Sequence, residues 1–334
     1  MFSNKKYVYE VYKAKSFSKA AEKLFISQPS LSLTIKKIEN GIGSQLFDRS
    51  TTPIQLTDCG EEYIRCTEKI MDIEYGFEMY LNDLNHLRTG RLAIGAGNFF
   101  ASYILPTLIT KFKALYPRVV INLVEADTAH LEKQLYSGDL DLIIDNYTFN
   151  EALYKKQFFY REQMILAIPE KLPCNKHIKQ YRLTSEDIIG NKHLNPQMPA
   201  VPLKLIEDTP FVLLRYGNDT RVRADNIFAE NHIKPNIELE LDQLATAFHV
   251  ACQGIGATLI SDTLVREVAP DQRMVYYKIN SKFATRENYF YFKISKYLTQ
   301  AMQEFLKLAA EQKQIENPIC SCYNKSNINL NELK

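Results

Sequence analysis

Histidine and cysteine are the residue types that most often carry nucleophilic or metal chemistry, and their spacing in this 334-residue sequence supports neither. The six histidines are scattered, and none lies three or four positions from another. The six cysteines form no CxxC pair, so reduced and mostly buried thiols are expected. Asp139 and Asp141 flank an expected strand, where a solvated turn is the simplest role. No glycine-rich nucleotide motif follows a strand, so the sequence indicates no catalytic residue, no metal site and no cofactor.

Binding is better supported, because small polar residues follow four of the expected strands. From residue 91 onward strands and helices alternate, which predicts a mainly parallel sheet. Ligands of such sheets bind at the carboxyl ends of strands, beside helix N-termini. The residues at these ends are Gly97, Asn98, Ser102, Thr128, Asn146, Gly217, Asn218 and Thr220. They predict a small-molecule pocket, although each residue could instead only cap its own helix, which is the simplest role for Asp219.

A second polar group, Ser-Gln-Pro-Ser at residues 27–30, stands inside a good helical pattern. Ser16 and Ser27 are good N-cap residues, and proline is tolerated in a first helical turn because its missing N–H has no partner there. The stretch is therefore predicted to form two helices joined by a short turn, the second ending near Gly41. In a helix-turn-helix, the second helix enters the DNA major groove with its N-terminal residues leading.

The start of this second helix carries side chains that can read bases. Glutamine pairs with adenine, serine bonds to several base edges, and the lysines further along suit phosphates. Residues 1–60 hold nine Lys/Arg against five Asp/Glu, whereas the whole chain has a net charge of only +2. The predicted DNA-binding residues are Gln28, Pro29, Ser30, Ser32, Lys36, Lys37 and, in a following hairpin over 49–56, Arg49. A structural helical hairpin with a solvated basic face is the alternative.

Apolar residues three and four positions apart from Tyr63 to Leu87 form a heptad seam on a long helix. The seam either packs within its own domain or pairs with the same helix of a second subunit. Pairing would place two reading helices on two half-sites of DNA, in a homodimer or homotetramer. The seam residues expected to pair are Ile70, Ile73, Phe77, Tyr80 and Leu84.

The stretch SFSKAAEKLFISQPSLSLTIKKIENGIGSQLFDRS…IQLTDCG resembles the winged helix-turn-helix of LysR-type transcriptional regulators. One departure is Leu33, where the family commonly has a basic residue. The resemblance implies a DNA-binding regulator with a two-lobed α/β domain of the type II periplasmic-binding-protein kind, which holds a small effector between its lobes. Helix N-termini that converge on such a pocket favour an anionic, carboxylate or amide-bearing effector.

The fold expected is therefore α/β and multidomain. The predicted parts are a winged helix-turn-helix (1–60), a linker and dimerisation helix (61–88), lobe I (89–163 and 265–315), lobe II (164–264) and a disordered tail (316–334). The segment 171–210 is expected to be a lid, a subunit contact or a surface loop. No apolar run reaches the ~20 residues of a membrane span, and no export signal is seen, so a cytoplasmic place is expected. A cytoplasmic small-molecule-binding protein or an enzyme on the same lobes is the alternative.

Overall fold

The computed structural model describes residues 2–51, 53–83 and 90–316. The chain divides into two compact units, one of Met1–Asn85 with Ser295–Thr299, the other of His86–Ile294 with Gln300–Lys334. The described part of the helix expected at 61–88, which runs to residue 83, thus groups with the N-terminal domain. The tail expected from residue 316 onward lies outside the described residues, apart from Glu316 itself.

The first unit begins with three helices around one apolar core. They are α1 (Lys5–Ala14), α2 (Phe17–Lys23) and α3 (Gln28–Ile42). Ser16 caps α2 and Ser27 caps α3, each accepting a hydrogen bond from the backbone N–H three residues on, as predicted. The helix α3 ends at Ile42, near Gly41 as predicted, and its C-cap is Gly43, which adopts the left-handed conformation (φ 82°).

A short hairpin and a long helix complete this unit. The hairpin pairs β1 (Phe47–Asp48) with β2 (Gln55–Leu56) in antiparallel register. The helix α4 (Asp58–Asp83) follows, and the hydroxyl of Thr57 accepts a hydrogen bond from the Gly60 N–H at 3.0 Å. A side chain at Gly60 would overlap the backbone carbonyl of Leu46, so only glycine fits where α4 starts beside the hairpin.

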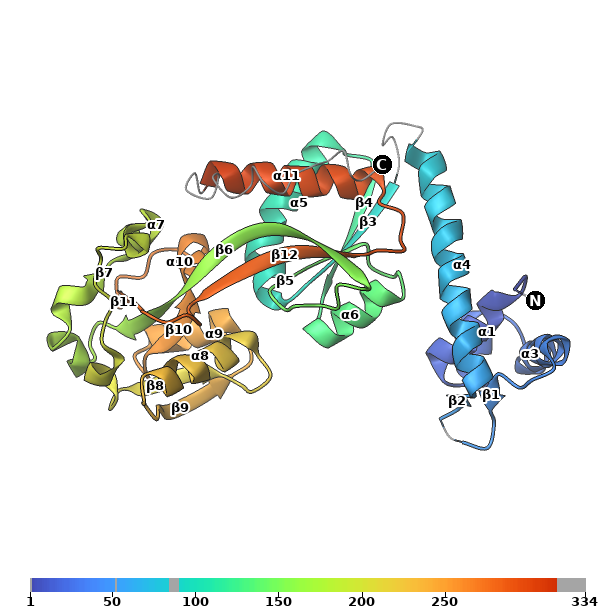
Figure 1. Ribbon diagram of the computed structural model, residues 1–334, viewed down its shortest axis with the longest axis horizontal. Helices are drawn as coiled ribbons and strands as arrows, with labels where there is room; N and C mark the ends of the chain where they lie inside the picture. The colour runs from blue at the N-terminus through green and yellow to red at the C-terminus, as the bar shows by residue number, and fades with distance from the viewer. Residues whose placement is uncertain (1, 52, 84–89, 317–334) are drawn as a thin grey trace. The chain divides into compact units, whose positions relative to one another are not determined.

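The second unit has two lobes, and the first is a helix–sheet–helix sandwich (Figure 1). Its strands are β3 (Gly90–Ala96), β4 (Val119–Glu125) and β5 (Leu142–Asp145), and β3 pairs in parallel with both neighbours. Its helices are α5 (Leu105–Leu115), preceded by the π-helical turn Phe100–Ile104, then α6 (Thr128–Tyr136) and α11 (Gln300–Glu316). Phe112 of α5 stacks edge-on against Phe305 of α11, which joins two helices far apart in sequence.

The second lobe packs helices and short strands around two apolar clusters. Its strands are β7 (Arg182–Leu183), β8 (Pro210–Leu214), β9 (Asn236–Leu241), β10 (Thr258–Ser261) and β11 (Met274–Lys278). Its helices are α7 (Ser185–Ile189), α8 (Asp219–Glu230), α9 (Leu244–Cys252) and α10 (Asp262–Glu267). The strand β11 was expected in lobe I, but Val275 and Tyr277 are buried in the lobe II core, so that lobe extends beyond residue 264.

Two long strands run from one lobe to the other (Figure 1): β6 (Tyr154–Pro169) and β12 (Thr285–Lys293). The first half of β6 pairs with β12, and its second half pairs with β10 and β11. All these pairings are antiparallel, as is that of β12 with β5. The prediction of a mainly parallel sheet was therefore wrong, because strand–helix alternation describes each lobe locally and does not reveal the strands that cross between them.

The segment 171–210 is packed onto lobe II and is absent from the pocket described below. It contributes Ile178, Val201, Leu203 and Ile206 to one apolar cluster of that lobe. His193, also in this segment, is buried and lies 3.0 Å from a carboxylate oxygen of Asp262. The segment therefore belongs to the lobe core and does not act as a lid over the pocket in this conformation.

Candidate functional site

The helix α3 presents a polar face that the fold does not use. Leu31, Ile35 and Glu39 are its buried residues. Gln28, Pro29, Ser30, Lys36 and Lys37 are exposed, and Ser32 is half-buried. The predicted DNA-contacting residues of α3 thus lie away from the core. Leu33 is also exposed on this helix.

Arg49 is tied to the body of the first unit. Its Nη2 lies 2.8 Å from a carboxylate oxygen of Glu39, and its guanidinium lies over the ring of Phe17. The other Glu39 oxygen accepts the Leu46 N–H at 2.9 Å, so this buried carboxylate fastens the hairpin to α3. The Arg49 side chain remains 40% exposed, which leaves it able to meet a phosphate as well.

The predicted seam on α4 forms an apolar surface at one end of the helix. Ile73, Phe77 and Tyr80 are exposed, Phe77 by 63%, and Ile70 is half-buried. Leu84 lies outside the described residues. Exposed aromatic and aliphatic side chains in a row on one helix are typical of a protein–protein contact.

A cavity of about 1030 Å³ lies between the two lobes of the second unit. Seven of the eight predicted ligand-contacting residues line it: Gly97, Asn98, Thr128, Asn146, Gly217, Asn218 and Thr220. The eighth, Ser102, does not line it. Within the π-helical turn, Phe100, Ala101 and Ile104 point into the protein, whereas Ser102 is exposed.

Most of these polar residues are already engaged by neighbouring side chains. Asn98 donates to Glu125 at 2.9 Å, and Thr128 donates to Asp145 at 2.8 Å. Asn218 caps α8 by accepting the Thr220 N–H at 2.9 Å. The predicted pocket residues therefore mainly form hydrogen bonds with the carboxyl groups and helix ends around them.

On the lobe I side of the cavity, the central group is the carboxyl of Asp145 at the end of β5. It is 6% exposed, and its oxygens accept the Thr128 hydroxyl and the Tyr147 N–H, each at 2.8 Å. No ion pair to Asp145 is found among the described residues. Burial, reinforced by the negative charge of Asp219, raises the pKa of Asp145, although its hydrogen bonds act in the opposite direction.

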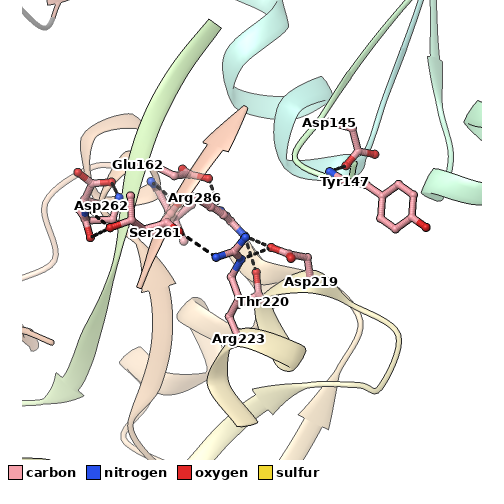
Figure 2. A network of polar contacts seen from close by, with 12 residues as sticks. Asp145, Tyr147, Glu162, Asp219, Thr220, Arg223, Ser261, Asp262 and Arg286 are labelled. Atoms are coloured by element: carbon pink, nitrogen blue, oxygen red, sulfur yellow. Dashed lines mark hydrogen bonds and ion pairs between the residues drawn. The ribbon is translucent and has the colours of Figure 1, made fainter. Parts of the chain in front are cut away.

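On the lobe II side, the central group is the guanidinium of Arg286 on β12 (Figure 2). It pairs with buried Glu162 through Nε, and its Nη1 lies 3.0 Å from the Thr220 hydroxyl and 3.3 Å from Asp219. Asp219 also pairs with Arg223 at 2.8 Å. Asp219 was expected only to cap α8, but Asn218 is the cap, and the half-buried Asp219 belongs to the ion network around Arg286.

The cavity wall is acidic overall. Its acidic members are Glu125, Asp127, Glu132, Asp145, Asp219 and Asp242, and its basic members are Arg215 and Arg286. Six carboxyl groups against two guanidinium groups leave an excess of four negative charges. The N-terminus of α6 is occupied by Asp127, which accepts the His130 N–H at 2.9 Å. The wall therefore offers no support for the anionic effector expected from the sequence.

The described residues give little support for a metal site, a reactive thiol or a membrane span. No group of three or more metal-binding side chains occurs among the residues described. The four cysteines within the described ranges are free thiols, and burial raises the pKa of Cys252 to about 12. Across those same ranges, no helix has the length and apolar character needed to cross a bilayer.

Family comparison agrees with both halves of this architecture. Residues 3–61 match the family described as "Bacterial regulatory helix-turn-helix protein, lysR family". Residues 85–314 match the family described as "LysR substrate binding domain". The chain therefore belongs to the LysR family, and it is a DNA-binding transcriptional regulator with an effector-binding domain.

Individual relatives are consistent with this membership. The chain is 31% identical over 312 residues to the uncharacterized HTH-type transcriptional regulator YcgK of Bacillus subtilis (strain 168), covering 91% of this chain and 92% of that protein. A probable RuBisCO transcriptional regulator of Thalassiosira pseudonana is 28% identical, with 76% and 78% covered. The fold is shared with a full-length OxyR variant from Pseudomonas aeruginosa, with a TM-score of 0.65, 22% identity, and 92% and 93% covered. It is also shared with full-length CbnR in complex with its target DNA, with a TM-score of 0.54, 14% identity, and 92% and 97% covered.

Proposed function

We propose that this regulator reads DNA with the exposed start of α3 and is switched by a small molecule held in the cavity between its lobes. The observation that carries the first part is the polar face of α3. Gln28, Ser30 and Lys37 are exposed there without serving the core, whereas Leu31 and Ile35 hold the helix in place. A helix that shows its N-terminal turn in this way suits insertion into a major groove.

The α3 residues have different expected roles along the helix. Gln28 on the first turn has the amide group that pairs with an adenine edge, while Lys36 and Lys37 suit phosphates. Arg49 joins them from the hairpin, since its guanidinium is partly exposed beside Glu39. We assign base reading to the first turn and backbone positioning to the lysines and Arg49.

The expected effect of Gln28→Ala is a loss of about 1–3 kcal/mol in binding to the cognate site, with the fold unchanged. A gel-shift titration against cognate and scrambled duplexes measures this. Asn40→Ala is the matched control, because Asn40 is an exposed amide at the far end of the same helix. Equal affinity of Gln28→Ala and the parent protein for the cognate duplex would remove Gln28 from the reading face.

We further assign self-association to the seam on α4, where Ile73, Phe77 and Tyr80 are exposed. Two copies joined along this seam bring two α3 helices to one operator, which suits half-sites arranged as a near-palindrome. Sedimentation equilibrium of the full chain should show dimers or tetramers. A purely monomeric protein at micromolar concentration would exclude the seam from this role.

Regulation without catalysis is the activity that the cavity wall favours. Thr128 donates to Asp145, and Arg286 pairs with Asp219, so these wall residues are held by contacts within the protein. The protein is proposed to act in the cytoplasm, where its DNA partner is found.

A further inference from the structure

We propose that the effector of this regulator is a small organic cation whose ammonium group binds the carboxylate of Asp145 at the lobe I wall. This inference rests on the proposed function, because it takes the interlobe cavity as the effector site. It assigns the charge of the effector, which the family comparison does not give.

The environment of Asp145 is the first support. The side chain is more than nine-tenths buried and faces the cavity at the end of β5. Its neighbours Thr128 and Tyr147 supply neutral hydrogen-bond donors, each at 2.8 Å. A carboxylate has about four acceptor positions, so acceptor capacity remains for a guest with several N–H donors, such as an ammonium group.

The cost of burying this carboxyl group points the same way. Removing a carboxylate from water without a counter-charge is unfavourable, and the pKa of Asp145 is accordingly raised by burial. The nearby Asp219 adds a like charge from across the cavity (Figure 2). A bound cation removes both penalties, whereas a bound anion adds to them.

The rest of the lobe I wall has the same sign. Besides Asp145, that lobe contributes the carboxyl groups of Glu125, Asp127 and Glu132 to the cavity and no basic side chain among its described lining residues. Tyr147, which is 56% exposed, adds an aromatic ring to this wall. Aromatic faces and carboxylates together recognise alkylammonium groups, through cation–π attraction and charge-assisted hydrogen bonds.

A metal ion is the other cation to consider, and the geometry favours the organic one. A divalent metal needs several oxygen ligands at about 2.0–2.6 Å around one point. No cluster of three or more acidic, histidine or cysteine side chains able to do this was found in the described part of the chain. The carboxyl groups are instead spread along the wall, where they suit an extended molecule.

The test uses two probes with the same five-carbon chain and opposite end groups, 1,5-diaminopentane and pentanedioate. We expect the diamine, and not the dicarboxylate, to raise the melting temperature of the full-length protein and to bind in calorimetry. Asp145→Asn should weaken diamine binding at least about tenfold, since hydrogen bonds to charged groups are the strong ones. Asp242→Asn is the matched control, because Asp242 lines the same cavity but already lies 3.5 Å from Arg215.

Three outcomes would overturn the inference: binding of pentanedioate in preference to the diamine, binding of Mg²⁺ that displaces the diamine, or equal diamine affinity in Asp145→Asn and the parent. Absence of any diamine binding up to about 10 mM would overturn it as well. The proposed DNA-reading function is tested separately by gel shift without any probe. A protein that binds its operator but ignores the diamine thus refutes the effector assignment alone.

Discussion

The two walls of the interlobe cavity treat their charges in opposite ways. On the lobe II wall, the carboxyl groups of Asp219 and Asp242 face the guanidinium groups of Arg286 and Arg215, so charge is balanced within the protein. On the lobe I wall, Asp145 has only neutral donors around it. A wall whose charges are paired within the protein is stable without a ligand. A wall with an unpaired charge is stabilised most when a ligand of opposite charge binds.

This contrast separates two uses of a buried charge. Removing one partner of a buried ion pair is costly because the other charge is left unpaired, so the Arg286 network acts as a fixed support between β6, β12 and α8. A buried carboxylate without a counter-charge carries that cost in the empty state. The free energy gained when the proposed cation binds then contributes to its affinity.

Arg286→Met should have the largest effect, because it makes the balanced wall resemble the other one. It leaves Glu162, whose side chain is fully buried, and Asp219 without the guanidinium that joins them. We expect a loss of about 3–5 kcal/mol in the free energy of unfolding, measured by urea denaturation. Arg215→Met is the control, and it should cost less than about 1 kcal/mol because Arg215 is exposed. Similar stability of the two variants would show that the buried network contributes no special support.

Thr128→Val should have an intermediate effect, because it deepens the imbalance on the lobe I wall. The change keeps the shape of the side chain but removes the hydroxyl that donates to Asp145. We expect a loss of about 1–3 kcal/mol in the free energy of unfolding and weaker effector binding. Thr128→Ser, which keeps the hydroxyl, should behave like the parent. In an Asp145→Asn background the effect of Thr128→Val should shrink, and an unchanged effect would mean that the two side chains are not coupled.

Asp145→Asn should have the smallest effect, and it should be of opposite sign. Because the pKa of Asp145 is raised in the folded state, its ionisation costs stability, and this cost appears as the pH rises from about 3.8 through the raised pKa. The variant should therefore match the parent at low pH and exceed it in stability at neutral pH. Thermal melts from pH 3.5 to 8 without ligand measure the difference. A variant less stable than the parent at neutral pH would contradict an uncompensated charge at this position.

The sequence predicted the features of this molecule that depend on near neighbours. Ser16, Ser27 and Pro29 marked the helix starts correctly, because a cap acts within three residues. The four polar strand ends indicated the cavity, since each directly follows the carboxyl end of a strand. Ser102 was misplaced because its exposure depends on the π-helical turn around it, which the residue pattern did not indicate.

The charges that define the two walls could not be predicted in the same way. Arg286 meets Glu162 and Asp219 across 124 and 67 residues of sequence, and those contacts exist only once β6 and β12 cross between the lobes. Asp145 is the last residue of the strand Leu142–Asp145, whose apolar residues predict a buried strand. The sequence pattern therefore pointed to Asn146, the first polar residue after the strand. The signal for Asp145 is nevertheless present in the sequence, as an acidic residue at the end of an apolar strand with no basic residue close behind it.

The crossing of β12 into lobe I also sets an order for events during synthesis. In lobe I, β5 ends at Asp145 and pairs with β12, where Asp145 lies opposite Tyr289. Because β12 begins at Thr285, a ribosome adding about 5–20 residues per second needs on the order of ten seconds between the two strands. During this interval β5 has an open edge, while the central strands of lobe II emerge. The helices of the N-terminal unit are therefore synthesised first, and the ligand cavity is completed only near the end of synthesis. We expect that a ribosome-bound chain cannot bind the effector until β12 has paired with β5.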